Sequence, residues 1–232
     1  REMGGLMNPE EPNILLFHGE LLDAYFSRHE LGDEGDQRYM PVRLSYFASL
    51  PLQYVLAGHF HSRYTGWQLP DGGLFIYPGS PVAVTRRENG RRVANLLTLG
   101  ETPAETALNS YHYEELKINL DPFNPVDPRV LLEQKLQGIH PQAKVLLTVQ
   151  GLFNGSALAL NESELAEALR KIAGSRLTGE LVEEFYDVQH VLEDDLFKHF
   201  SSKLAGLDCP PGQEEKVKEM VIRAFRVVKA CS

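Results

Sequence analysis

The chain has 232 residues, of which 43% are hydrophobic and 24% are charged, and its formal net charge is −9. This composition is typical of a globular protein with one large or two small domains, and it argues against a long disordered chain. The acidic balance argues against a protein that coats DNA through its own surface charge, because phosphate contacts need lysine and arginine. A nuclease is still allowed, because bound metal ions supply local positive charge.

The sequence carries no sign of a membrane segment. No apolar run approaches the roughly 18 residues of a membrane span, and residues 1–12 lack the apolar core of a signal peptide. We therefore expect a cytoplasmic protein, and because the chain begins with Arg1 we expect its true start to lie upstream. Cys209 and Cys231 are not spaced as zinc ligands, which predicts two reduced thiols.

Three short apolar runs near the start of the chain predict strands that are buried on both faces. They cover residues 13–17, 53–57 and 73–77. Between the first two runs we expect a loop over residues 20–40 and a short helix over residues 41–50, with proline tolerated in its first turn.

A hairpin is predicted after the third run. Residues 81–87 and 91–99 have strand-like patterns and flank an Asn89-Gly90 pair, where both turn residues must tolerate a positive φ. Four arginines at this turn either contact DNA phosphates or are exposed charges that prevent edge pairing, and both interpretations stay open. These arginines are Arg86, Arg87, Arg91 and Arg92.

A polar, proline-containing stretch at residues 100–110 is typical of a linker. We therefore expect two domains, residues 1–107 and 108–232, of an α/β or α+β fold. The second domain reads as alternating strands and helices followed by two more helices, which favours a sheet covered by helices. Its expected strands cover residues 111–120, 143–150 and 181–189, and its expected helices cover residues 127–138, 161–173, 192–204 and 214–229.

Two of these helices have clear start signals. Asp127 is a good N-cap, and Asn161 with Glu164 three residues later forms a capping-box pattern. The last two helices carry apolar residues at helical spacing, which favours core packing, with a partner-binding surface as the alternative.

Three histidines directly follow predicted strands, His18 after the first and His59 and His61 after the second. Ligand sites in layered α/β folds form at the carboxyl ends of strands, where rigid elements fix the ligands. A lone histidine at a strand end is most often a satisfied loop residue. The pair separated by one residue and preceded by Gly58 favours a metal site, and neutral imidazoles suit Zn, Mn or Fe.

The segments Phe17-His18-Gly19, Ala57-Gly58-His59-Phe60-His61 and Tyr77-Pro78-Gly79-Ser80 resemble the C-terminal half of the calcineurin-like metallophosphoesterases. The GHxH element is the most specific of them. With the PGS element that follows, it resembles the DNA-repair exonuclease (SbcD-like) branch. Residues 113–123 and 144–151 look like the capping domain of that branch, although this likeness is looser.

The resemblance implies a dinuclear-metal DNA exonuclease or phosphodiesterase in which metal-activated water attacks a phosphodiester bond. It implies that His18 and His59 bind one divalent ion and His61 the other, with Mn expected first and Fe or Zn as alternatives. Gly58, Gly79 and Ser80 would shape the floor of the site. The implied partners are DNA, an SbcC-type ATPase and a second copy in a homodimer, with no membrane.

The resemblance also implies that the chain is only the C-terminal part of such a protein. The expected fold is half of a two-layer metallophosphoesterase β-sandwich flanked by helices, plus a small α+β capping domain. The family's DxH, GDxxD and GNH[DE] motifs, and the general acid, belong upstream of His18 and are absent from this sequence. We expect a truncated polypeptide that is inactive alone, binds metal weakly and exposes a sheet edge.

Two other functions stay open. The first is a metallophosphoesterase that acts on another substrate class. The second is a non-catalytic binding module on the same scaffold.

Overall fold

The computed structural model contains both sheets and helices, which confirms a mixed α+β class. It divides into two compact units. Unit 1 comprises Arg1–Glu114 and His140–Lys144, and unit 2 comprises Glu115–Ile139 and Val145–Ser232. The predicted boundary between residues 107 and 108 lies close to this division and stays a prediction. The structure describes residues 3–24, 39–124, 126–207, 210 and 212–230.

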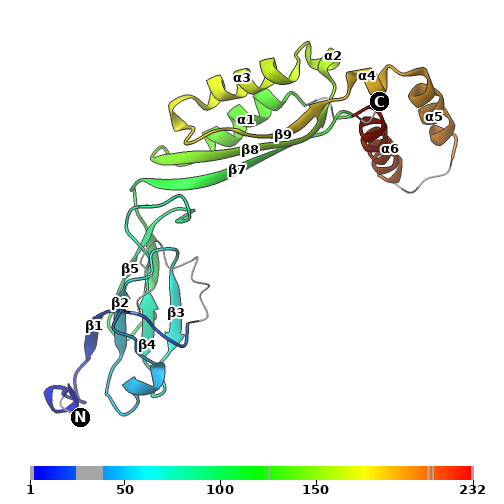
Figure 1. The fold of residues 1–232 in the computed structure, drawn as a ribbon. Helices are drawn as coiled ribbons and strands as arrows, with labels where there is room; N and C mark the ends of the chain where they lie inside the picture. Colours follow the sequence, from blue (N-terminus) through cyan, green and yellow to red (C-terminus); the bar gives the residue numbers. More distant parts are fainter. Residues whose placement is uncertain (1–2, 25–38, 125, 208–209, 211, 231–232) are drawn as a thin grey trace. The chain divides into compact units, whose positions relative to one another are not determined.

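Unit 1 is built on a four-stranded sheet with the order β1-β2-β4-β3 (Figure 1). β1 pairs in parallel with β2 and β2 in parallel with β4, whereas β3 runs antiparallel to β4. The three strands predicted from apolar runs are therefore confirmed, and β3 was missed because it is short and half polar. The strands are β1 (Ile14–His18), β2 (Tyr54–Gly58), β3 (Thr65–Gln68) and β4 (Leu74–Tyr77).

The core of this sheet lies on its central strands. Val55 of β2 and Phe75 and Tyr77 of β4 are fully buried. β1 differs, because Leu16 is 78% exposed. The prediction that this strand is buried on both faces is wrong, since an edge strand has one neighbour and one of its faces is uncovered among the described residues.

The segment before β2 contains little regular structure. The predicted helix over residues 41–50 is reduced to the 3₁₀ turn η3 (Leu44–Phe47), and a second 3₁₀ turn, η1 (Met3–Leu6), precedes β1. The loop predicted over residues 20–40 falls mostly on residues 25–38, which lie outside the described residues.

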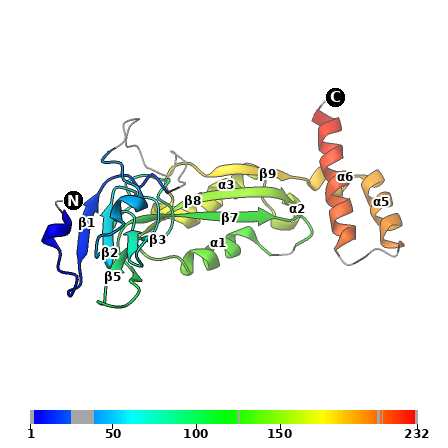
Figure 2. The same cartoon turned by 90° about the horizontal axis from the view of Figure 1, so that it is seen from below.

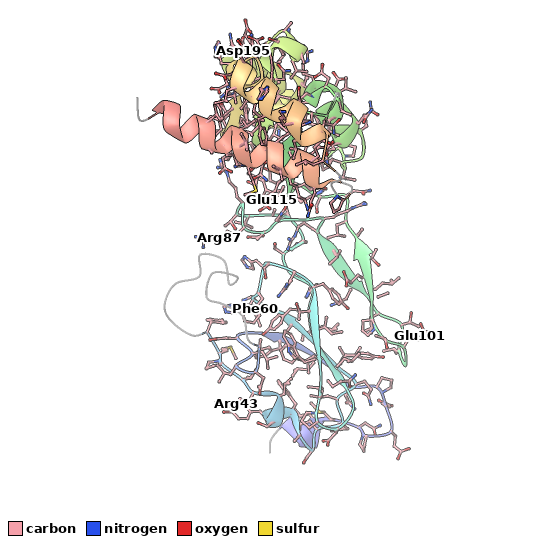
Figure 3. All side chains as sticks on the ribbon, turned by 90° about the vertical axis from the view of Figure 1, so that its right-hand side faces the viewer. Arg43, Phe60, Arg87, Glu101, Glu115 and Asp195 are labelled. Atoms are coloured by element: carbon pink, nitrogen blue, oxygen red, sulfur yellow. The ribbon has the colours of Figure 1, made fainter. Side chains whose placement is uncertain are left out.

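The predicted hairpin around Asn89-Gly90 is wrong. No described residue from 81 to 92 belongs to a strand, and Asn89 makes only an isolated bridge to Tyr113. The actual hairpin follows, where β5 (Val93–Leu96) pairs antiparallel with β6 (Ala104–Ala107), so the predicted linker contains a strand. Glu101 lies in the turn of this hairpin, at the edge of unit 1 in Figure 3.

Unit 2 contains most of a three-stranded sheet with the order β7-β8-β9. β8 pairs in parallel with β9, and Figure 2 shows β7 and β8 pointing the same way. Helices α1 (Pro128–Gln137) and α3 (Glu162–Ala173) connect successive strands and pack against each other. The strands are β7 (His112–Leu120), β8 (Ala143–Phe153) and β9 (Val182–Asp187).

The predicted helix starts are confirmed. The Asp127 carboxylate accepts a hydrogen bond of 2.8 Å from the Arg129 N–H. Asn161 and Glu164 form a reciprocal capping box, with two bonds of 2.9 Å. These caps satisfy backbone donors that have no partner inside the helix.

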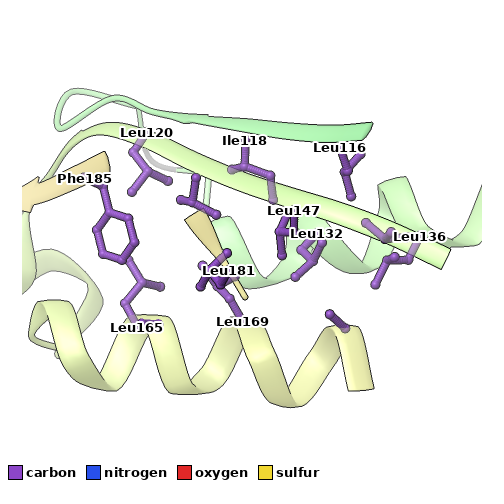
Figure 4. Packing of buried hydrophobic residues seen from close by; sticks show 14 of the residues in the cluster. Leu116, Ile118, Leu120, Leu132, Leu136, Leu147, Leu165, Leu169, Leu181 and Phe185 are labelled. Carbon is purple, nitrogen blue, oxygen red and sulfur yellow. The ribbon is translucent and has the colours of Figure 1, made fainter. Parts of the chain in front are cut away.

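The core of unit 2 is apolar. Alternate residues of the strands, including Ile118 and Leu147, point toward α1 and α3 and meet Leu132, Leu165 and Leu169 (Figure 4). All five side chains are at most 1% exposed. This layer of leucine and isoleucine between sheet and helices is the packing predicted for the second domain.

The rest of unit 2 is helical. The helix predicted over residues 192–204 corresponds to α5 (Asp195–Ala205), which starts later than predicted because Asp194 caps it by accepting from the Leu196 N–H at 2.9 Å. The short α4 (Gln189–Leu192), which was not predicted, precedes it. α6 (Gln213–Ala230) follows. Short turns α2 (Gly155–Leu158) and η4 (Gly174–Arg176) complete the unit. Of the helices formed by the described residues, none has both the length and the apolar character needed to cross a bilayer.

Candidate metal centre

The parallel strands of unit 1 bring three loops to one edge of the sheet. β1, β2 and β4 run in the same direction, so their carboxyl ends meet. His18 ends β1 and is paired with Gly58 at the end of β2. The loop with His59 and His61 follows β2, and the loop with Ser80 follows β4.

Gly58 lets the His18 ring lie against the end of β2. A Cβ atom at position 58 would lie 3.0 Å from Nδ1 of His18, which is tighter than ordinary contact. With no side chain there, the His18 and His59 rings approach to 5.6 Å between centroids. Tyr39 packs against both rings, at 5.6 Å from His18 and 5.9 Å from His59.

His59 has an unusual backbone conformation. Its φ is +131°, a region that side-chain-bearing residues rarely adopt, and the residue is only 8% exposed. Such strain persists only where the surroundings enforce it, and it is concentrated at binding and catalytic sites. The conformation therefore singles out His59 beyond what its position in the sequence indicated.

The spacing of His18 and His59 suits a shared metal ion. With metal–nitrogen bonds of about 2.1 Å, two imidazoles on one ion have centroids on the order of 5 to 6 Å apart. The observed 5.6 Å lies in that range. The ligand set is incomplete, because within the described ranges no group of three or more His, Cys, Asp or Glu side chains is arranged to hold a metal ion. The histidines fit part of a centre that needs further ligands.

His61 faces a buried carboxylate. Its Nδ1 lies 3.7 Å from Oε1 of Glu88, and the His61 side chain is 30% exposed whereas that of Glu88 is 2% exposed. The Glu88 carboxylate accepts hydrogen bonds from the Ser80 hydroxyl and from the Val84 and Thr85 N–H groups. Burial alone would raise the Glu88 pKa, but these donors and His61 outweigh it and hold that pKa below its ordinary value of 4.5.

The loop after β4 is tied to the loop after β2. The Ser80 N–H donates to the His61 carbonyl at 3.1 Å. A Cβ at Gly79 would lie 3.1 Å from that carbonyl and 2.9 Å from Nη2 of Arg92, and Gly79 has a φ of +81°. Only glycine meets both demands. Gly58, Gly79 and Ser80 thus lie at the histidine loops, where the resemblance places the floor of the site.

Arg92 does not lie at an exposed hairpin tip. It is 3% exposed, and its guanidinium donates to the carbonyls of Ser62 and Ser80 at 3.0 and 2.9 Å and to those of His61 and Glu88. Burial lowers the pKa of this guanidinium, and the Glu88 charge opposes that shift. Arg92 is therefore a buried link between the loops after β2 and β4, and the expectation that it is an exposed DNA contact is corrected. Arg86, Arg87 and Arg91 are exposed.

Tyr77 connects β4 to the end of β1. Its hydroxyl donates to the Gly19 carbonyl at 2.5 Å, next to His18. Burial raises the pKa of this phenol well above its ordinary value of 10.0. The side chain is thus a neutral donor that helps to fix the turn after His18.

Glu88 and Tyr39 were missed in the sequence. For Glu88 a signal was present, because Thr85-Arg86-Arg87-Glu88 has the T-x-x-E spacing of a capping box. That pattern predicts a carboxylate folded back onto the Thr85 N–H, as observed at 3.2 Å. The adjacent Asn89-Gly90 pair predicts a hairpin turn at the same place, and the two patterns compete. Tyr39 carries no local signal, since only the fold brings it to the histidines.

Comparisons with known proteins add no family assignment. A scan against models of protein families found no match to this chain. A search of curated proteins found no match either.

Proposed function

We propose that this chain is the C-terminal part of a dinuclear-metal phosphodiesterase with the calcineurin-like sandwich, and that the intact protein is a cytoplasmic DNA exonuclease subunit of the SbcD-like branch acting in DNA repair. One observation carries the proposal. Parallel strands β1 and β2 end side by side, and the ring centroids of His18 and His59 lie 5.6 Å apart beside Gly58. His61 lies in the same loop as His59.

The proposed roles follow from these positions. His18 and His59 bind one ion through ring nitrogens, and His61 binds the other. When bound, two divalent ions in such a site activate water and neutralise charge on phosphate oxygens. Mn is the first choice, and imidazole ligands also suit Fe or Zn. The carboxylate ligands and the general acid come from other parts of the intact polypeptide.

Exposed groups support DNA and protein partners. Arg86, Arg87 and Arg91 lie on the surface and are suited to phosphate contacts that position DNA without reading its sequence. The SbcC-type ATPase of this proposal would contact the amphipathic helices α5 and α6, where Leu196 and Met220 are 65% and 70% exposed. A homodimer of the intact protein belongs to the same proposal.

The test is cleavage of linear duplex and single-stranded DNA by the intact polypeptide with Mn²⁺. We expect His59→Ala to lower the rate by more than about 100-fold, because loss of a ligand costs at least as much as loss of a group that orients one. His199→Ala is the matched control, since this histidine is exposed on α5 in unit 2. It should leave cleavage unchanged.

The other outcomes separate the alternatives. Cleavage that survives His59→Ala would contradict the proposed role of the histidines. Hydrolysis of a simple aryl phosphodiester without DNA cleavage would indicate another substrate class. No activity on either substrate, with an SbcC-type ATPase present, would favour a binding module.

A further inference from the structure

Glu88 lies beside a proposed metal ligand and is 1% exposed. We propose that Glu88 is a positioning residue for the metal centre: its carboxylate accepts a hydrogen bond from Nδ1 of His61 and so directs Nε2 of the same ring toward the metal. The inference rests on the proposed function, in which His61 is a ligand. It adds a residue, a ring tautomer and a ligating atom that the motif resemblance does not include.

The Glu88 carboxylate is fixed by its other partners. Oε2 accepts from the Ser80 hydroxyl at 2.5 Å and from the Val84 N–H at 3.0 Å. Oε1 accepts from the Thr85 N–H and hydroxyl at 3.2 and 3.3 Å, which are longer bonds. Oε1 is the less tightly held oxygen and the one that faces Nδ1 of His61 at 3.7 Å, so a hydrogen bond from His61 would replace the weak bond from the Thr85 hydroxyl.

The main chain of His61 is fixed from the other side. Its carbonyl accepts from the Ser80 N–H and from Nη2 of Arg92. Arg92 also binds the Glu88 carbonyl, so one guanidinium links the backbone of the histidine to the backbone of its carboxylate partner. The ring therefore approaches Glu88 from a constrained position, and a movement of about half an ångström would close a normal hydrogen bond.

This arrangement selects one tautomer of His61. A carboxylate accepts and does not donate, so the proton must be on Nδ1 and Nε2 must carry the lone pair. Metal-binding histidines commonly donate their second ring N–H to a carboxylate, which fixes the ring and raises its basicity. The 30% exposure of the His61 side chain leaves a route for an ion to reach Nε2.

The wild-type chain itself provides the first test. Long-range proton–nitrogen NMR spectra at pH 8, without metal, report which ring nitrogen of His61 carries the proton. The inference requires Nδ1–H. An Nε2–H tautomer in the wild type overturns it, and this result needs no variant to fold.

Glu88→Gln provides the second test. Its amide oxygen should face Ser80 and Val84, where the bonds are shortest, so its NH₂ group should face His61 and the bond from the Thr85 N–H should be lost. Two donors cannot face each other, and the ring should change to the Nε2–H tautomer. Glu101→Gln is the matched control, because this exposed carboxylate lies in the β5–β6 turn (Figure 3) and should leave the tautomer unchanged.

Metal affinity of the intact polypeptide then separates the inference from the proposed function. Titration with Mn²⁺ should show binding about 10- to 100-fold weaker in Glu88→Gln, with no change in Glu101→Gln. If His59→Ala abolishes binding while Glu88→Gln leaves it within twofold, Glu88 has no positioning role and the proposed function stands. If His59→Ala leaves binding unchanged, the proposed function fails, and Glu88 has no metal ligand to position.

Discussion

The two units are stabilised in different ways. Unit 2 has a continuous apolar layer in which strand residues such as Ile118 meet Leu132 and Leu169. Unit 1 also has an apolar core, but its histidine loops depend on buried polar groups, chiefly Glu88 and Arg92. Apolar packing tolerates many residue combinations of similar volume, whereas a buried polar network fails when one member is removed. The candidate site should therefore be the more easily broken part.

Arg92→Ala should have the largest effect. It removes a charged donor from the carbonyls of His61, Ser62, Ser80 and Glu88, of which, among the described residues, only that of His61 keeps a bond from Ser80, and this should destabilise unit 1 by about 3–5 kcal/mol. Trp67, the single tryptophan, packs on Phe75 and reports unit 1 by fluorescence during urea unfolding. Arg91→Ala, one residue away and exposed, should cost less than about 1 kcal/mol. Equal losses for both arginines would contradict the buried link.

Leu169→Ala tests the other side of the comparison. Leu169 is fully buried in the apolar layer, so the truncation should destabilise unit 2 by about 3 kcal/mol. Circular dichroism in the far ultraviolet should detect the loss, because unit 2 contains helices α1 to α6. Lys171→Ala on the exposed side of α3 is the control. If the Trp67 transition shifts as much as the helix signal, the two units do not unfold separately.

Acid should destabilise unit 1 through Glu88. Its folded pKa lies below the ordinary 4.5, so the folded state binds the proton less readily than the unfolded chain. The stabilising contribution is fully present above about pH 4.5 and is lost as the pH falls through the lower folded pKa. Trp67-monitored unfolding below pH 5 should show this loss, and Glu88→Gln should reduce it. An unchanged pH dependence in the variant would assign the acid sensitivity to other groups.

Asn161→Ala should have the smallest effect, about 1 kcal/mol on unit 2, because it removes one half of the α3 capping box. Glu167→Ala on the exposed face of the same helix should stay within about 0.5 kcal/mol. Thermal unfolding followed by circular dichroism is sufficient to compare them. A larger loss for Glu167→Ala would show that surface contacts, not the cap, hold this helix.

The same contrast explains what the sequence predicts. In unit 2 the signals are local: Asp127 and Asn161 mark helix starts, and periodicity marks strands, so the three strands and the four longer helices were predicted, whereas the short α2, η4 and α4 were not. In unit 1 the three strand runs and the histidines at their ends were predicted. The contacts that Glu88 and Arg92 make with His61, Ser62 and Ser80 were not, because these partners lie 8 to 31 positions away. A hydrogen-bond network over such separations leaves no periodic pattern.

The central claim is that His18, His59 and His61 bind divalent metal, and paramagnetic broadening by Mn²⁺ tests it most directly. Substoichiometric Mn²⁺ is added to the chain, and NMR signals of the histidine rings are compared, since even weak binding broadens nearby resonances. The account predicts selective broadening of His18, His59 and His61, with the exposed His190 and His199 of unit 2 unaffected. Broadening of His190 and His199 to the same extent, or no broadening of the three rings, would contradict it.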